Sequence, residues 1–121
     1  MPREILPNRR LQITSTVFYQ DPFSQGSGMS FEISFGFNPQ SCLKELFIST
    51  KTHPLTPLLN DICILISRLL QHGDTIESVA AAMGENRREG DTFGHPSSFI
   101  GAIVRQGCMV QAEVGATLSN G

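Results

Sequence analysis

MSFEISFGF, residues 29–37, is the stretch that decides the fold. Apolar side chains occupy alternate positions, with small or polar ones between them: Met29, Phe31, Ile33, Phe35 and Phe37 against Ser30, Glu32, Ser34 and Gly36. Because successive side chains of a β-strand point to opposite faces, this alternation predicts a strand with one apolar and one polar face. Other elements of the chain must cover the face that carries the phenylalanines.

Two further strands are expected beside this one. Residues 11–19 are β-favouring, with Leu11, Ile13, Val17 and Phe18 among threonines. Residues 43–50, LKELFIST, are apolar on both faces at their centre, which is typical of a strand that lies between neighbours. Turn residues at 21–28 and 38–41 separate the three runs, so we expect an antiparallel meander.

A helix from about Thr56 to His72 is expected to cover the apolar face. Thr56 is a good N-cap, Pro57 suits the first helical position, and Gly73 suits a left-handed cap after His72. Apolar residues recur at helical spacing along it: Leu58, Ile62, Leu65, Ile66 and Leu69.

Two shorter helices are expected to follow. In the first, Asp74 as N-cap and Glu77 form a capping box, Ile76, Val79, Ala80 and Met83 give the inner face, and Gly84 closes the helix. In the second, Ser97 or Ser98 is the cap and the apolar stripe is Phe99, Ile100, Ile103 and Val104. We expect a single α+β domain over residues 1–121, a three-stranded antiparallel sheet covered by two to three helices. Its core spans about residues 11–106, with flexible ends and fraying over 115–121.

The helix at 56–72 also predicts self-association. Additional apolar residues widen its stripe to most of the circumference: Leu59, Cys63, Ile64 and Leu70. One small sheet cannot bury so wide a surface, so a second helix or a partner chain is implied. We expect a homo-oligomer.

Length and composition narrow the functional class. The 121 residues suit one domain, and a net charge of −2 with nine dispersed basic residues argues against a duplex-binding surface, so nucleic acid is an unexpected partner. The longest apolar run, residues 58–70, carries Asp61 and Arg68 and is too short to span a bilayer. Three separated cysteines and a start without an apolar signal segment favour reduced thiols in the cytoplasm.

Catalytic signatures are weak. His72 stands in the last turn of a helix, where an imidazolium interacts favourably with the helix dipole, and this role alone can explain it. His53 and His95 each precede a proline, no histidine–carboxylate pair has helical metal-ligand spacing, and no G-x-S-x-G motif occurs, so no metal and no cofactor are expected. The alternative that remains is a small hydrolase or thiol enzyme that uses Cys42 or His72.

GHPSS, residues 94–98, is the most suggestive polar motif. Serine hydroxyls and free backbone N–H groups at a helix start can bind an anion, and Arg87 and Arg88 lie in the loop just before it. A phosphate or nucleotide is the ligand that fits such a site. The other interpretation is that Ser97 and Ser98 only cap the helix while the arginines are solvated.

The order of these segments resembles the TSCPD-domain family. The similarity covers about residues 4–106 and is carried by LPNRR (6–10), KELFISTK (44–51), LLNDICILISRLLQHGDTIESVAAAM (58–83) and HPSSFIGAIV (95–104). That domain occurs at the carboxyl end of adenosylcobalamin-dependent ribonucleotide reductases and as small free-standing bacterial proteins. The resemblance implies an accessory module without reductase activity of its own.

The Thr-Ser-Cys-Pro-Asp string that names the family is absent, and Gln40-Ser41-Cys42-Leu43 is the nearest approach to it. The resemblance therefore implies no thiol role for Cys42. It adds Lys51, which ends the KELFISTK segment, to the candidate anion ligands. The expected function is a non-catalytic module that binds a nucleotide or phosphate ligand, or a protein partner of the ribonucleotide reductase type.

Overall fold

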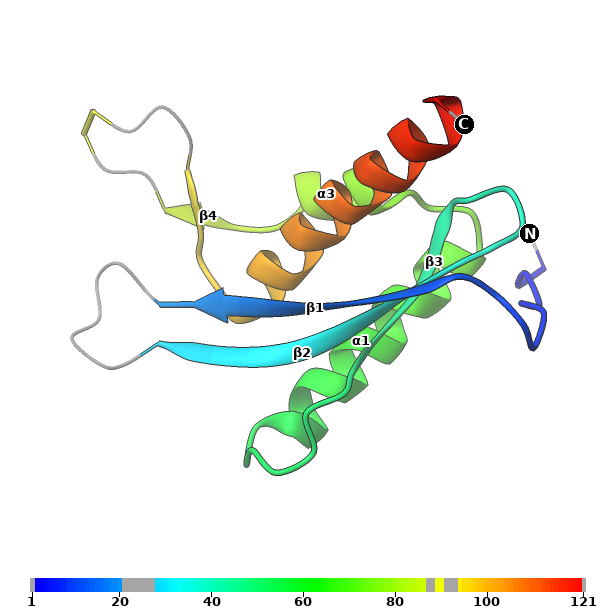
Figure 1. Cartoon of the computed structure of the whole chain (residues 1–121). Helices are drawn as coiled ribbons and strands as arrows, with labels where there is room; N and C mark the ends of the chain where they lie inside the picture. Colours follow the sequence, from blue (N-terminus) through cyan, green and yellow to red (C-terminus); the bar gives the residue numbers. More distant parts are fainter. Residues whose placement is uncertain (1, 21–27, 87–88, 91–93, 121) are drawn as a thin grey trace.

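The computed structural model describes residues 2–20, 28–86, 89–90 and 94–120 (Figure 1). In chain order its elements are β1 (Gln12–Tyr19), β2 (Met29–Phe37), β3 (Leu43–Ile48), α1 (Thr56–Gln71), α2 (Ile76–Ala81), β4 (Glu85–Asn86), β5 (His95–Pro96) and α3 (Phe99–Asn120). A three-stranded antiparallel sheet with three helices confirms the expected α+β class.

The large sheet has the strand order β1-β2-β3, and each pair of neighbours is antiparallel. The alternation in residues 29–37 sets its inner face, because Phe31, Ile33, Phe35 and Phe37 are at most 1% exposed. A bulge between Gly36 and Phe37 shifts the register so that Phe37 pairs with Leu43, which is also buried. The phenylalanine face is thus continuous across β2 and the start of β3.

Helices α1 and α3 bury their inner faces with the phenylalanine face in a single core. α1 packs chiefly on β3, and α3 packs on β1, β2 and the short helix α2 (Figure 1). The helical members of the core are Leu59, Cys63, Ile66, Leu70, Ile76, Val79, Phe99, Ile103, Val104, Val110 and Val114. Helices α1 and α3 therefore cover the sheet together, and α2 packs against α3.

Helix α3 is longer than expected. It runs to Asn120, and the expected core limit of about residue 106 is wrong because the core extends to Val110 and Val114. The fraying expected for residues 115–121 stays a prediction. The two valines continue the inner stripe of the helix. Gly107 allows the close packing at its centre, because a Cβ there would lie 3.1 Å from the Ile76 side chain and 3.2 Å from that of Leu43.

Helix α1 turns a different face to the core from the one expected. Leu58, Leu65 and Leu69, assigned to the inner stripe, are 59%, 62% and 48% exposed. The buried apolar residues of the helix are Leu59, Cys63, Ile66 and Leu70. The expectation was wrong because both stripes are apolar, so apolar spacing alone does not distinguish them.

Polar side chains distinguish the two faces of α1, because they close the free edge of β3. Three of them hydrogen-bond to the backbone of alternate β3 residues: Asn60 Oδ1 accepts from Ile48 N–H (3.0 Å), Ser67 Oγ accepts from Leu46 N–H (2.9 Å) and Gln71 Nε2 donates to Lys44 O (3.1 Å). An uncovered edge strand would leave these groups without partners. α1 thus covers the edge of the sheet as well as its face.

The helix starts differ from the expected caps at two places. Thr56 is the first residue of α1 rather than its N-cap, and its hydroxyl donates to Thr50 O (3.1 Å). α2 is capped by Thr75, which accepts from Ser78 N–H (3.1 Å), rather than by Asp74, and it ends at Ala81, before Gly84. The expected end of α1 is confirmed, because His72 is its C-cap and Gly73 has φ 115°.

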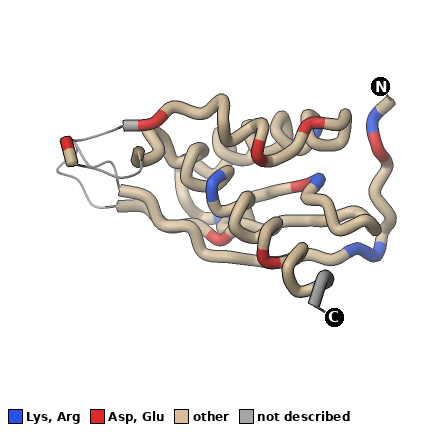
Figure 2. The backbone as a smooth tube through the Cα atoms, turned by 90° about the horizontal axis from the view of Figure 1, so that it is seen from above, with Lys and Arg blue, Asp and Glu red and all other residues tan. Residues whose placement is uncertain are grey.

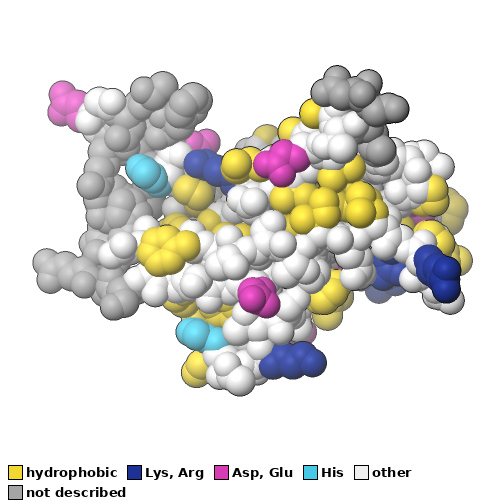
Figure 3. Space-filling model, viewed as in Figure 1, with side chains coloured by type: hydrophobic (Ala, Val, Ile, Leu, Met, Phe, Trp, Pro, Cys, Tyr) yellow, Lys and Arg dark blue, Asp and Glu magenta, His cyan; other side chains and the backbone are white. Residues whose placement is uncertain are grey.

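The other face of the sheet has no helix on it in the described part of the chain. A row of hydroxyls crosses this face, in which Ser34 Oγ lies 3.0 Å from Thr14 Oγ1 and 2.9 Å from Ser49 Oγ. Figure 3 shows hydrophobic side chains in separate patches rather than in one continuous surface. Figure 2 shows acidic and basic residues scattered along the backbone, without a continuous basic tract among the described residues.

Candidate functional site

The serines of the expected anion site lie at the start of α3. Ser98 Oγ accepts from Gly101 N–H (3.1 Å), so the capping interpretation holds for this hydroxyl. Ser97 N–H donates to Gly84 O (3.1 Å), and both serine side chains are exposed. Arg87 and Arg88 lie outside the described residues.

Lys51 is exposed and is the third residue after the end of β3. Ring contacts bring the loop after it toward α3, because the Phe31 ring centroid lies 4.8 Å from that of His53 and 4.9 Å from that of Phe99. No contact of Lys51 with either serine is described. Its place in an anion site remains a prediction, together with those of Arg87 and Arg88.

A cavity of about 360 Å³ opens beside the start of α3. The end of β1, the strand β5 and the middle of α3 form its walls, which consist of Thr16, Val17, Phe18, Tyr19, Gln20, His95, Pro96, Ala102, Arg105, Gln106 and Met109. A small-molecule pocket commonly has an apolar lining with a few convergent polar groups. The lining of this cavity is more polar than that, with about as many polar as apolar residues and one guanidinium among them.

Arg105 is the cationic centre of this cavity. Its Nη1 donates to Gly94 O (2.9 Å), its Nη2 lies 3.9 Å from Glu85 Oε2, and the side chain is 46% exposed. The long distance to a half-exposed carboxylate makes this a weak ion pair. Since a guanidinium has five N–H donors, further donors remain for a ligand.

Tyr19 holds the wall of the cavity in place. Its hydroxyl donates to Pro96 O (2.9 Å), and its ring meets the Phe99 ring edge-on at a centroid distance of 6.2 Å. These contacts fasten β5 to the end of β1 and to the first turn of α3. The cavity is therefore built from three elements that are fixed relative to one another.

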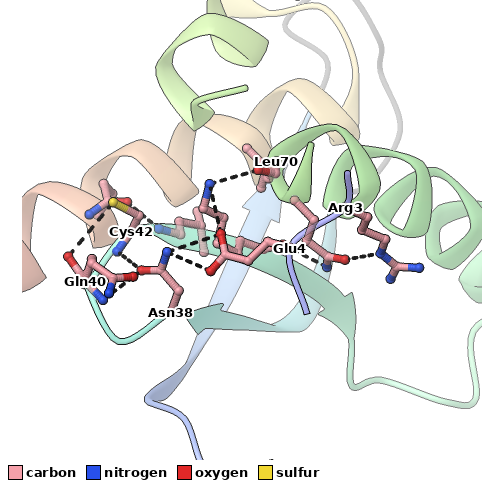
Figure 4. A network of polar contacts seen from close by, with 10 residues as sticks. Arg3, Glu4, Asn38, Gln40, Cys42 and Leu70 are labelled. Atoms are coloured by element: carbon pink, nitrogen blue, oxygen red, sulfur yellow. Dashed lines mark hydrogen bonds and ion pairs between the residues drawn. The ribbon is translucent and has the colours of Figure 1, made fainter. Parts of the chain in front are cut away.

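A polar network surrounds the C-terminal end of α1 (Figure 4). Lys44 Nζ donates to Leu70 O (3.0 Å) and lies 3.5 Å from Glu4 Oε1. Asn38 Nδ2 donates to Glu4 Oε2 (3.0 Å), and Arg3 Nε donates to Gln71 Oε1. A cation at the last carbonyls of a helix is favourable, so this network ties the N-terminal segment to the end of α1 by ordinary structural contacts.

Cys42 belongs to a tight turn at this end of the molecule. Its N–H donates to Asn38 Oδ1 (2.9 Å), and its thiol lies 3.9 Å from Gln40 O. It shares a cavity of about 290 Å³ with Lys44, Asp74 and Glu77, among other residues. No histidine is among the described residues that line this cavity.

Cys63 and Cys108 are less reactive than Cys42 because their thiols are less exposed to solvent. Burial raises the pKa of the Cys63 thiol to about 12, and burial also raises the pKa of Cys108, with a further contribution from the charge of Glu77. Among the described residues, no group of three or more His, Cys, Asp or Glu side chains is placed to hold a metal ion. None of the helices described is long and apolar enough to cross a membrane.

Sequence reasoning missed Arg105 and Tyr19. The available signal for Arg105 was its position on the polar side of α3, about two turns after the serines, but nothing in the sequence placed the end of β1 beside it. Comparison of the chain with protein-family models, with curated proteins and with solved structures found no match.

Proposed function

We propose that the protein is a non-catalytic binding module whose cavity beside α3 holds a phosphate-bearing small ligand such as a nucleotide. The observation that carries the proposal is the Arg105 guanidinium in the wall of the 360 Å³ cavity. Arginine matches a phosphate in bidentate geometry and keeps its charge at all physiological pH values. The apolar part of the lining offers contact for a base or another ring.

The residues singled out in the sequence remain part of the proposal. Ser97 and Ser98 follow Pro96, a wall residue of the cavity, in the sequence, and we expect their hydroxyls to add polar groups at its edge. In the sequence Arg87 and Arg88 belong to the segment that joins β4 to β5. We expect these arginines, and Lys51, to add positive charge around a bound phosphate.

The proposed setting follows from the resemblance to the TSCPD-domain family. In that setting the module acts in the cytoplasm as a homo-oligomer, and a ribonucleotide reductase-type protein is the candidate protein partner. The exposed apolar residues of α1 support self-association, since Leu58, Leu65 and Leu69 are about half exposed. The family setting itself is supported by the sequence segments alone.

Calorimetric titration of a nucleoside diphosphate into the protein tests the proposal. Arg105→Gln removes the guanidinium and should weaken binding roughly 10- to 150-fold, the equivalent of one charge-assisted hydrogen bond of about 1.5–3 kcal/mol. Arg9→Gln, an exposed arginine of the N-terminal segment, is the matched control and should leave binding unchanged. A wild type that binds no nucleotide, or an Arg105→Gln variant that binds as well as the wild type, would refute the proposal.

Two further variants separate this function from the enzyme alternative. Cys42→Ala and His72→Ala remove the side chains that a thiol enzyme or hydrolase would need, and neither side chain lines the cavity beside α3. We expect both variants to bind the nucleotide as the wild type does. Arg87→Ala combined with Arg88→Ala should weaken binding by a similar amount to Arg105→Gln.

A further inference from the structure

The outer face of α1 carries a continuous apolar stripe. Its members are Leu55, Leu58, Ile62, Leu65 and Leu69, and their spacing alternates between three and four residues. The four leucines are 38%, 59%, 62% and 48% exposed in chain order, and Ile62 is partly buried. This spacing is the repeat by which two helices pack along a common seam.

Nothing within the described part of the chain covers this stripe. α1 packs chiefly on β3, through the neighbouring face that carries Leu59, Cys63 and Leu70. In Figure 1 the helix forms one border of the molecule, with no described element beyond it. Single exposed leucines are common on protein surfaces, but a row of four over about 21 Å is not.

Opposite charges flank the stripe. Asp61 and Arg68 each directly precede a stripe residue, so they lie on the same side of it, two helical turns apart. Both side chains are exposed, and within the described part of the chain neither forms an ion pair. This flank therefore carries one acidic and one basic group at a fixed separation.

We infer that a second copy of this chain covers the stripe, with the two α1 helices packed antiparallel about a two-fold axis beside Leu65. The inference rests on the self-association in the proposed function and deepens it by naming the surface. A two-fold axis reverses the order of residues in the second helix. Asp61 then lies beside Arg68 of the partner subunit, and Arg68 lies beside Asp61 of the partner subunit.

The charges select this orientation over the parallel one. In a parallel pair, the flank with Asp61 and Arg68 would face the other flank of the partner helix, which carries the core residues Leu59 and Ile66. No charge on that flank could complement it. An antiparallel two-fold pair is also closed, so it uses the same surface of both copies and forms a dimer rather than a filament.

Sedimentation equilibrium of the full chain tests the surface. The wild type should be a dimer at about 100 µM, since a small interface of this kind corresponds to micromolar affinity. Leu65→Ser should raise the dimer dissociation constant at least about tenfold, because each copy loses an apolar contact at the centre of the seam. Ile64→Ser is the matched control: Ile64 is 52% exposed on the same helix but off the stripe, and its replacement should leave the dimer intact.

Charge exchange tests the orientation. Asp61→Arg alone and Arg68→Asp alone each bring like charges together in the antiparallel pair, so each should weaken its own dimer. Carrying both substitutions in one chain should restore the dimer, and an equimolar mixture of the two single variants should form a heterodimer. Single variants that dimerise as well as the wild type would overturn the antiparallel arrangement.

Separate outcomes distinguish this inference from the rest of the proposed function. A monomeric wild type at about 100 µM would overturn both the self-association and the surface. A dimer that Leu65→Ser leaves unchanged would overturn the surface alone. The stripe does not line the cavity beside α3, so the monomeric Leu65→Ser variant should bind the nucleotide as the wild type does. Loss of nucleotide binding in this variant would show that the two sites are not independent.

Discussion

Replacing Ser67 by alanine should destabilise the protein through the edge of β3. The Ser67 hydroxyl accepts from Leu46 N–H at 2.9 Å, and the two residues are 7% and 1% exposed. Without the hydroxyl, this buried N–H loses its partner, which costs about 1–3 kcal/mol. The better helix propensity of alanine returns about 0.5 kcal/mol. We therefore expect a net loss of about 0.5–2.5 kcal/mol in the free energy of unfolding.

Urea unfolding followed by circular dichroism measures this loss, and Ser78→Ala provides the control. Ser78 is exposed on α2, so its replacement tests helix propensity without a buried hydrogen bond. The difference between the two variants should be about 1–3 kcal/mol, with a melting temperature lower by roughly 3–6 °C for each kcal/mol. A difference below about 0.5 kcal/mol would refute the idea that α1 side chains satisfy the edge of β3.

Three further predictions concern packing and thiol chemistry. Gly107→Ala should lower the free energy of unfolding by about 1–3 kcal/mol, because the new Cβ would lie 3.1 Å from the Ile76 side chain. Gly115→Ala should be neutral or stabilising, because the space around Gly115 is open. Thermal melts of both variants test this. Cys63 should resist a thiol reagent at pH 8 in the folded protein while the exposed Cys42 reacts, as mass spectrometry of the labelled protein would show. Burial raises the pKa of the Cys63 thiol in the folded protein from 9.0 to about 12. The contribution of this thiol to stability is therefore complete below pH 9 and is lost as the pH rises toward 12. A Cys63→Ala variant whose stability falls by the same amount over this pH range would contradict this prediction.

The three strands were predictable because their signal is local, but the expectation that residues 43–50 lie between two strands was wrong, because β3 is at the edge of the sheet and α1 covers its free side. Alternating phenylalanines in residues 29–37 determine both the strand and its buried face, and the structure has the same bounds for β2. The turn residues that follow place β3 beside it. No contact between distant residues was needed for these assignments.

The orientation of α1 was not predictable in the same way. Two apolar stripes compete for the core, and the choice depends on Asn60, Ser67 and Gln71, whose partners are backbone groups of β3. Polar residues on a helix usually indicate the solvent side, so periodicity favoured the wrong stripe. Their hydrogen-bonding role emerges only when the strand edge is known.

The candidate site was predictable only in part. A serine cap at the start of α3 follows from the sequence, and Ser98 has that role. Arg105 joins the site because the fold brings β1 and β5 alongside α3, and the contact between Tyr19 and Pro96 spans 77 residues of sequence. A cavity assembled from such distant segments leaves no motif.

The most direct test of the ligand site is a titration of inorganic pyrophosphate into the wild-type protein, followed by the amide resonances of the ¹⁵N-labelled chain. Saturable shifts are expected at residues that line the cavity beside α3, with the largest at Ala102, Arg105 and Gln106. The amide resonances of residues near Lys44, which contacts the C-terminal end of α1, should not shift. Shifts that fail to saturate, or saturable shifts centred on Lys44 and the N-terminal segment, would contradict the proposed binding site.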